Sequence, residues 1–403
     1  MPQKLTTIVP KMVSNSQKPQ NHDAVLGGSK SQSSSAAILG GLSGVKYRLK
    51  SSVVGERVVA VQEAFNYGQE GFSLVLEALQ DPHFSVGYAA YLLLSKLGQT
   101  EVTEILQDSN PYQKFRCLYR YSTAPSTAYT LAISPDGQFL ASGSDDTSIK
   151  VRSLTNGKII RTLAGHWNSV SSVVFHPHKE VLVSGSWDGN VKFWRKEALI
   201  RDLRGHQAKI NTATISPDGQ LIASGSQDGH IKIWHVNQLQ AIHSWQGHEN
   251  WVNSLVFTPD SNHLISCSSD CTIKIWHVQT QELTHTFTQP DRVKCLALNC
   301  NGKFLVSGSQ DKFIYVIDLS TRELLHTLKE HWGEINSLAI SQEGQTLVSA
   351  GWDETINIWH IPTGVCLHSL SGHESPIFAL AISPDGKRIV SAGKDRKILV
   401  WGA

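Results

Sequence analysis

Cysteines, long apolar stretches and a secretory leader are what this sequence has least of. Its six cysteines are spread thinly over 403 residues, unlike the dense framework of a disulfide-stapled secreted domain. No stretch approaches the ~20 apolar residues that a membrane-spanning helix needs. The N-terminus has no apolar segment of the kind found in signal peptides. We therefore expect a protein without a membrane span, located in the cytoplasm.

The chain also has little net charge. The 36 basic and 34 acidic side chains leave a net charge of +2, which gives no basis for binding nucleic acid through bulk charge. The motifs of serine hydrolases, phosphate-binding loops, zinc proteases and dinucleotide-binding domains are missing as well. From these absences we expect no enzyme, no cofactor and no catalytic or metal site.

What the sequence has is repetition. From about residue 112 onward, seven segments such as SGSWDGNVKFW and SAGWDETINIW recur at intervals of 40 to 42 residues. Every segment has an aspartate with a serine four residues before it, and in five of them a tryptophan follows the aspartate by six residues and a histidine precedes it by 22. The five complete sets are His166, Ser184, Asp188 and Trp194; His206, Ser224, Asp228 and Trp234; His248, Ser266, Asp270 and Trp276; His331, Ser349, Asp353 and Trp359; and His373, Ser391, Asp395 and Trp401.

The residues between these markers alternate between apolar and polar, as in VNSLVF and TIKIWHV, and are rich in β-branched side chains. Ser-Pro-Asp-Gly stretches at 134–137, 216–219 and 383–386 are typical of tight turns. The pattern predicts short antiparallel strands joined by turns.

Together, the period, the Gly-His pairs and the late tryptophans resemble the WD-repeat family over residues 112–403. The resemblance implies a mainly β fold, a seven-bladed β-propeller with four strands per blade. It also implies that His, Ser, Asp and Trp of one blade form a buried hydrogen-bond network, which gives the His–Asp pairs a structural rather than a catalytic role. The first and fifth segments have Ala124 and Gln289 at the histidine position, so we expect their blades to be the least stable.

The family repeat begins with the outer strand of one blade and continues with three strands of the next. Because the last segment ends with Trp401, its blade lacks an outer strand. Alignment of the repeats places residues 117–121 at that position. We expect the strand 117–121 to complete the last blade and to close the ring, which leaves fewer strand edges open.

The N-terminal third differs in character. Residues 1–43 are rich in Ser, Gln, Lys and Gly and read as a disordered basic tail, which we interpret as a solvated linker in preference to a contact for acidic lipid or nucleic acid. Residues 44–111 show helical spacing in ERVVAVQEAF and VGYAAYLLLSKL. The pattern Asp81, Val86, Ala89, Ala90, Leu97 and Gly98 resembles a HEAT-type helix. A short HEAT-like segment before such a propeller resembles bacterial WD-repeat proteins of cyanobacterial type.

Four cysteines lie close enough in the sequence to suggest zinc: Cys267, Cys271, Cys295 and Cys300. Their spacings are tolerable for a metal site. The repeat register, however, distributes them over an inner strand, a turn and the following blade. We interpret them as small hydrophobic residues and expect no metal.

Five tryptophans lie outside the network and the outer strands. In repeat register they fall in the turn before the aspartate or just after the histidine, at one face of the propeller, and several other residues join them there. The predicted partner-binding residues are Trp167, Trp187, Trp251, Trp332, Trp352, Tyr129, Phe378, Lys209, Arg292, Lys294 and Lys394, and Asn211, Asn253 and Asn336 should point the same way.

Aromatic side chains with arginine are typical of interface hot spots. We interpret the chain as a non-catalytic scaffold that binds one or more proteins or peptides on this face. An alternative is that the tryptophans only cap the core. A second alternative is a sensor that binds a small ligand or nucleic acid there, and a third is a hydrolase site in the central channel.

Overall fold

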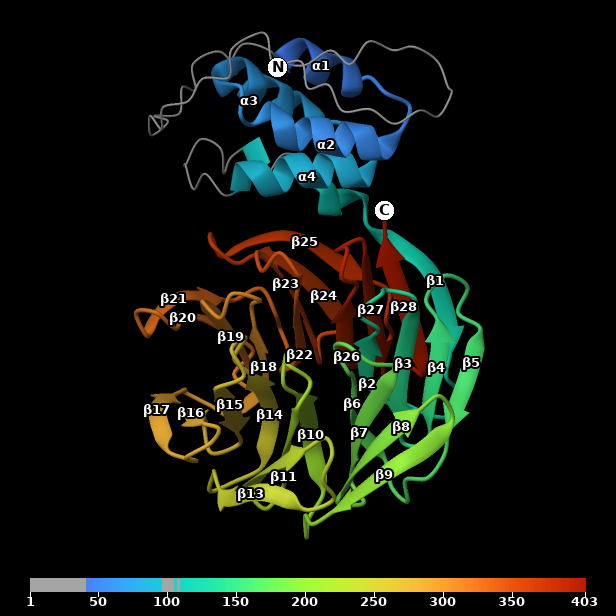
Figure 1. The fold of residues 1–403 in the computed structure, drawn as a ribbon, viewed down its shortest axis with the longest axis vertical. Helices are drawn as coiled ribbons and strands as arrows, with labels where there is room; N and C mark the ends of the chain where they lie inside the picture. Colours follow the sequence, from blue (N-terminus) through green and yellow to red (C-terminus); the bar gives the residue numbers. More distant parts are fainter. Residues whose placement is uncertain (1–40, 96–104, 107–108) are drawn as a thin grey trace. The chain divides into compact units, whose positions relative to one another are not determined.

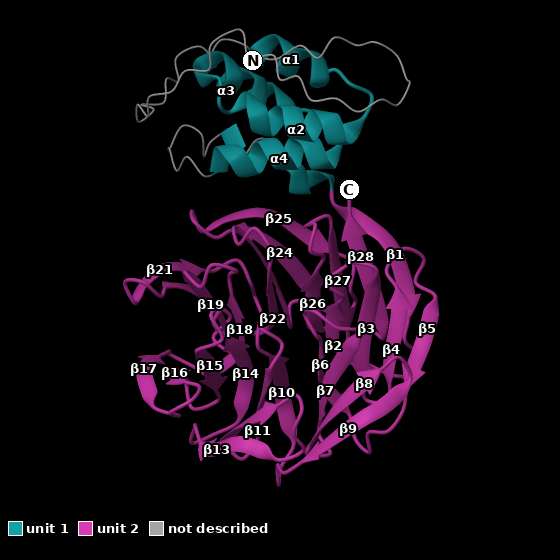
Figure 2. Cartoon of the chain, viewed as in Figure 1, with its two compact units in different colours: residues 1–114 teal, residues 115–403 magenta. Residues whose placement is uncertain are grey.

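The computed structural model describes residues 41–95, 105–106 and 109–403. The chain divides into two compact units, one ending at Lys114 and the other running from Phe115 to Ala403 (Figure 2). Nearly all of the predicted tail, and Leu97 and Gly98 of the HEAT-type pattern, lie outside the described residues.

The second unit confirms the predicted fold class: seven four-stranded antiparallel sheets are arranged around a common centre (Figure 1). The inner strands are β2 (Ala128–Ile133), β6 (Val170–Phe175), β10 (Ile210–Ile215), β14 (Val252–Phe257), β18 (Val293–Leu298), β22 (Ile335–Ile340) and β26 (Ile377–Ile382). The second strands are β3 (Phe139–Ser144), β7 (Val181–Ser186), β11 (Leu221–Ser226), β15 (His263–Ser268), β19 (Phe304–Ser309), β23 (Thr346–Gly351) and β27 (Arg388–Gly393). The third strands are β4 (Ile149–Ser153), β8 (Asn190–Arg195), β12 (His230–His235), β16 (Thr272–His277), β20 (Ile314–Asp318), β24 (Thr355–His360) and β28 (Lys397–Gly402). The outer strands are β5 (Ile159–Leu163), β9 (Ala198–Arg204), β13 (Ala241–Gln246), β17 (Leu283–Thr288), β21 (Glu323–Leu328), β25 (Val365–Ser371) and β1 (Arg116–Ser122).

Turn chemistry joins the inner strand of a blade to the second strand. In the turn after β2, the Gly137 N–H donates to the Ser134 carbonyl at 2.8 Å, and Gly137 has a φ of +70°. Only glycine adopts that backbone conformation without strain. The Asp136 carboxylate accepts from the Gln138 N–H at 3.0 Å. Such turns return the chain after each short strand and so set the meander of a blade.

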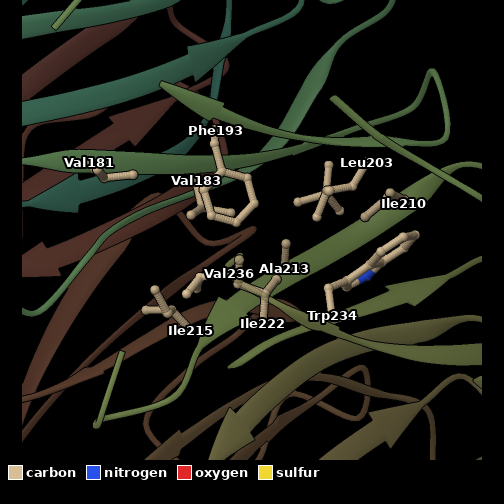
Figure 3. Packing of buried hydrophobic residues seen from close by; sticks show 11 residues of the cluster. Val181, Val183, Phe193, Leu203, Ile210, Ala213, Ile215, Ile222, Trp234 and Val236 are labelled. Atoms are coloured by element: carbon tan, nitrogen blue, oxygen red, sulfur yellow. The ribbon is translucent and has the colours of Figure 1, made fainter. Parts of the chain in front are cut away.

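Apolar contact between neighbouring blades forms the core. Between the second and third blades, Val183, Phe193 and Leu203 face Ile210, Ile222 and Trp234, all of them buried (Figure 3). Equivalent clusters lie between other neighbouring sheets. Because each sheet is covered on both faces, its central strands are almost wholly buried. Burying this apolar surface is the main force that holds the blades together.

The two ends of the propeller meet in one blade. Outer strand β1 pairs antiparallel with β28, and Cys117 lies opposite Trp401. Inner strand β26 of this blade contacts β2 of the first blade, so the ring of inner strands is continuous. Residues 117–121 therefore lie within the strand that completes the sheet formed by β26, β27 and β28.

The first unit is helical: α1 (Gly41–Arg48), α2 (Val54–Ala64), α3 (Gly68–Ala78), α4 (Phe84–Ser95) and the short 3₁₀ helix η1 (Pro111–Lys114). Since α1 begins at Gly41, the helical part starts before residue 44, and η1 belongs to it rather than to the propeller. Arg57 of α2 binds Asp81 with Nε–Oδ2 at 3.0 Å and also donates to the Ser51 carbonyl. The HEAT-type resemblance stays a prediction. None of the helices in the described part of the chain is both long and apolar enough to span a membrane.

Candidate protein-binding face and the networks beneath it

In the second blade the four marker residues form a continuous chain of hydrogen bonds. His166 Nδ1 lies 2.7 Å from Asp188 Oδ2, and His166 Nε2 lies 2.8 Å from Ser184 Oγ. Trp194 Nε1 donates to the same Ser184 Oγ at 2.8 Å. Since a carboxylate only accepts, His166 donates from Nδ1, which leaves Nε2 to accept from the serine hydroxyl. Every polar atom of this buried group therefore has a partner.

The fourth, sixth and seventh blades repeat this arrangement. The His Nδ1–Asp Oδ2 distances are 2.8, 2.7 and 2.9 Å for His248–Asp270, His331–Asp353 and His373–Asp395. The three histidines contact Ser266, Ser349 and Ser391, which accept from Trp276, Trp359 and Trp401. Both nitrogens of each ring are engaged, so these His–Asp pairs are structural in their geometry.

The networks also position the loops above them. The Asp188 carboxylate accepts from the backbone N–H of Trp167 at 3.0 Å, and Asp353 accepts likewise from Trp332 at 2.9 Å. Burial would raise the pKa of Asp188, but the hydrogen bonds from His166 and from the Trp167 backbone outweigh burial and lower it. The aspartate thus stays ionised and holds the loop that presents the exposed tryptophan.

The third blade departs from the prediction. His206 Nε2 contacts Ser224 Oγ at 2.7 Å, but no hydrogen bond joins His206 to Asp228, and the buried His206 Nδ1 has no partner. His230, which only this blade has after its turn glycine, places Nδ1 3.4 Å from Asp228 Oδ1. Burial and the nearby positive charge of Lys232 lower the pKa of His206 to about 4. The predicted His206–Asp228 link is therefore wrong: the Asp228 carboxylate accepts from the His230 backbone N–H at 2.9 Å, and the His230 ring makes no hydrogen bond to it.

The two blades without the histidine use other donors, which the sequence reading missed. In the first blade, Asp146 accepts from Ser126 Oγ and from Lys150 Nζ, at 2.5 and 2.6 Å. In the fifth blade, Asp311 accepts from the Tyr315 hydroxyl at 2.7 Å. A donor stands four residues after the aspartate in both segments, but Lys192, Lys232 and Lys274 occupy the same place in blades that have the histidine, so the sequence carries no distinguishing signal.

Every inner strand has a β-bulge at its second residue. The pairing of each inner strand with its neighbour shifts by one residue at the same repeat position. The seven bulge residues are Tyr129, Ser171, Asn211, Asn253, Lys294, Asn336 and Phe378. A bulge turns a side chain out of the regular alternation. Two further repeat positions lie beside the bulge and are joined by a backbone hydrogen bond in every blade. The residues two places before the bulge are Thr127, Ser169, Lys209, Trp251, Arg292, Glu334 and Pro376. The residues just before the internal aspartate are Asp145, Trp187, Gln227, Ser269, Gln310, Trp352 and Lys394. We call these 21 residues the inner ring.

Three aromatic residues of the inner ring touch one another. The Tyr129 ring lies 5.4 Å from Trp187 and 5.5 Å from Phe378, centroid to centroid. Lys209 places its ammonium 4.8 Å from the centre of the Trp187 ring. These contacts bring together four of the predicted binding residues, from the seventh, first, second and third blades.

Four of the other bulge residues are polar and hydrogen-bonded to the next blade. Asn211, Asn253 and Asn336 each donate to a backbone carbonyl of the next blade, at 3.2, 2.7 and 2.8 Å. Ser171 Oγ donates to the Ile210 carbonyl in the same way. These side chains therefore join neighbouring blades and are less available to a partner than the sequence suggested.

The remaining predicted residues differ in exposure. Trp167 and Trp332 are 84% and 85% exposed, and Trp251 and Trp352 are 49% exposed. Arg292 and Lys394 are exposed, whereas Lys294 is half-buried and pairs with Glu334 at 3.4 Å. Trp187, Tyr129 and Phe378 are half-buried.

Among the described residues, no group of three His, Cys, Asp or Glu side chains could hold a metal ion. Cys267 and Cys295 are buried, Cys271 lies in a turn and Cys300 is exposed. Burial raises the pKa of Cys295 to about 12. No thiolate is therefore available at the buried positions near neutral pH.

Comparison with known proteins agrees with this geometry. Residues 115–153, 157–195 and 364–402 match the WD domain, G-beta repeat model, and each match spans an outer strand and the three strands of the next blade. Residues 195–361 match the model of the IFT122 first beta-propeller.

Among curated proteins, the Periodic tryptophan protein 2 homolog of Schizosaccharomyces pombe is 39% identical over 79 residues, or 19% of this chain and 9% of the relative. The mouse homolog is 33% identical over 88 residues, 22% of this chain and 9% of the relative. Periodic tryptophan protein 2 of Arabidopsis thaliana is 32% identical over 106 residues, 25% of this chain and 10% of the relative. The matches thus span about a tenth of the length of these relatives.

These relatives are eukaryotic and do not support the resemblance to bacterial proteins of cyanobacterial type. The features that suggested it, helices before a propeller, follow from the fold and carry no information on biological source. The repeat geometry and the matches to the repeat model agree with each other. The chain contains WD40 repeats and forms a seven-bladed β-propeller behind a helical N-terminal segment.

Proposed function

We propose that the protein is a non-catalytic interaction scaffold that binds segments of other proteins on the face bearing the inner ring. The observation that carries this proposal is the set of five tryptophans placed there by three repeat positions, of which four are about half or more exposed. A large exposed aromatic surface gains free energy when a partner covers it. Tryptophan is also the side chain most enriched among interface hot spots.

The state of the His–Asp pairs supports a role without catalysis. In four blades the imidazole holds a serine on one side and an aspartate on the other. A general base needs a ring nitrogen within reach of a substrate proton. Both nitrogens of each of these rings are already hydrogen-bonded. The four His–Asp pairs therefore do not support a hydrolase site in the central channel.

The test compares binding by the wild type and by the double variant Trp251→Ala/Trp352→Ala. Both side chains are half-exposed, and neither belongs to a network, so we expect the melting temperature to stay within a few degrees. Partners captured from native lysate and quantified by mass spectrometry should be lost from this variant. The matched control, Ile160→Ala/Leu325→Ala, removes exposed apolar side chains from outer strands β5 and β21 and should keep them. Equal partner sets for both variants would refute the proposed face.

Trp187 is less suitable for the first test. Its ring packs on Tyr129 and makes a cation–π contact with Lys209. Its removal would therefore change the packing of the inner ring as well as any contact with a partner.

A further inference from the structure

The inner ring is not uniform around the propeller. On one side, Phe378, Tyr129 and Trp187 form a continuous row in the seventh, first and second blades. On the other side, the asparagine amides already bind carbonyls of neighbouring blades. A partner thus finds contiguous aromatic surface in one sector, whereas in the other sector Trp251 and Trp352 lie in separate blades, among amides that already have partners. We call Phe378, Tyr129 and Trp187 the aromatic row.

A cation lies at each end of the aromatic row. Lys209 stands over the outer face of Trp187, which holds its ammonium in place. At the other end, Lys394 follows strand β27, whose last residue, Gly393, pairs with Ile377 beside Phe378. The Lys394 N–H also donates to the Pro376 carbonyl at 2.8 Å. Both lysines are exposed.

Neither lysine is neutralised by a carboxylate. Within the described ranges, Lys209 and Lys394 form no ion pair, whereas Lys294 of the same ring pairs with Glu334. Arg292 of the inner ring is likewise exposed and without an ion pair among the described side chains. The ring has two acids, Asp145 and Glu334, and Glu334 is already paired. The unpaired charge of the inner ring is therefore three cations against Asp145 alone.

Asp145 lies beside the middle of the row. Burial and the Asp145 carboxylate together raise the pKa of Tyr129, and the other contact of Asp145 is an N–H from Thr127 at 2.9 Å. A continuous anion such as a nucleic-acid strand would meet this carboxylate halfway between the two lysines. A partner with an uncharged middle avoids that repulsion.

We propose that the aromatic row binds an extended protein segment with an aromatic or branched aliphatic side chain flanked on both sides by acidic residues. The apolar side chain would cover Tyr129 between Trp187 and Phe378, and the flanking carboxylates would pair with Lys209 and Lys394. The charge complementarity selects this occupant over a basic segment, and the position of Asp145 selects it over a nucleic acid. This inference rests on the proposed function, since it names the partner of the same face.

The experiment is selection of random 12-residue peptides, displayed on phage, against the immobilised full chain, followed by affinity measurement with synthetic copies. We expect selected peptides to be enriched in Asp or Glu within a few residues of Phe, Trp, Leu or Ile. Lys209→Glu/Lys394→Glu should weaken their binding by about tenfold or more and should shift a new selection toward Lys and Arg. Lys158→Glu, an exposed lysine at the opposite ends of the strands, should leave affinity unchanged.

Three results would overturn the inference. Peptides of neutral or basic composition that still depend on Trp251 and Trp352 would leave the proposed function standing and refute the acidic partner. Peptides insensitive to every inner-ring variant would refute both. Displacement of the peptides by a single-stranded oligonucleotide at low salt, with a steep loss of oligonucleotide affinity as salt rises, would assign the row to nucleic acid instead. Melting curves of the double lysine variant check that it is folded.

Discussion

The Tyr315 hydroxyl donates a 2.7 Å hydrogen bond to Asp311 in the blade where Gln289 takes the place of the histidine. The repeat thus keeps its aspartate satisfied by a donor from the neighbouring strand β20 when the loop provides none. The serine of that blade, in contrast, is unpaired: the buried Ser307 Oγ has no hydrogen-bond partner. We therefore expect this blade, which lacks both the histidine and the tryptophan, to be less stable than its neighbours.

Asp188→Ala should destabilise the protein more than Asp311→Ala. Removal of the Asp188 carboxylate leaves the buried His166 Nδ1 and the Trp167 N–H without an acceptor, which costs about 2–4 kcal/mol of unfolding free energy. Removal of Asp311 deprives one side-chain donor, the Tyr315 phenol, of its acceptor, and about 1 kcal/mol is expected. Urea denaturation of the two variants, with Tyr315→Phe as the control for the phenol alone, measures the difference. Equal losses would contradict the ranking.

His206→Ala should cost less stability than His248→Ala. The His248 ring links Ser266 to Asp270, whereas His206 contacts Ser224 only and already buries an unpaired nitrogen. We expect a difference of about 1–2 kcal/mol in unfolding free energy from the extra hydrogen bond to a charged group. The two substitutions remove the same atoms from neighbouring blades, so each serves as the control for the other. A larger loss for His206→Ala would show that its ring binds Asp228 after all.

Acidification should destabilise the fold between about pH 6.5 and 4. Burial lowers the pKa of His206 and of His360 to about 4. An unfolded histidine has a pKa of about 6.5, so below that pH the unfolded chain binds protons that the native protein does not. The stability that depends on the neutral rings is therefore complete above pH 6.5 and falls as the pH drops toward 4.

Each of the two rings would account for up to about 3 kcal/mol over that interval. Urea titrations at several pH values, with the wild type beside His206→Gln and His360→Gln, measure this dependence. Each variant should show a shallower slope of unfolding free energy against pH. A slope identical to that of the wild type would mean that the replaced histidine has the same pKa in the native and the unfolded protein.

Truncation should separate the helical unit from the ring closure. A fragment of residues 115–403 keeps β1 and its pairing with β28, so we expect it to fold. A fragment of residues 123–403 loses β1, which exposes the edge of β28, and we expect aggregation or a melting temperature lower by more than about 10 °C. Circular dichroism and size-exclusion chromatography of both fragments test this. A monomeric, cooperatively melting 123–403 fragment would refute the need for the closing strand.

Two features of the binding face could be read from the sequence and one could not. The repeat register places Trp187 and Trp352 before the internal aspartate and Trp167 and Trp332 after the histidine, and the structure describes all four at those turns. The contact of Tyr129 with Phe378 could not be read, because it joins the first and the last blade of the chain. That contact depends on the ring being closed.

The sequence by itself determined the number of blades, the residues of four of the networks and the strand that completes the last blade. These follow from periodicity, because equal segments bury their apolar faces only by stacking on one another. Tertiary structure alone decided that the Asp228 carboxylate makes no hydrogen bond to His206, that asparagine amides join neighbouring blades, and that bulge residues gather in the inner ring. Those outcomes depend on which polar groups compete at a few ångströms, and such distances are set only when neighbouring blades pack.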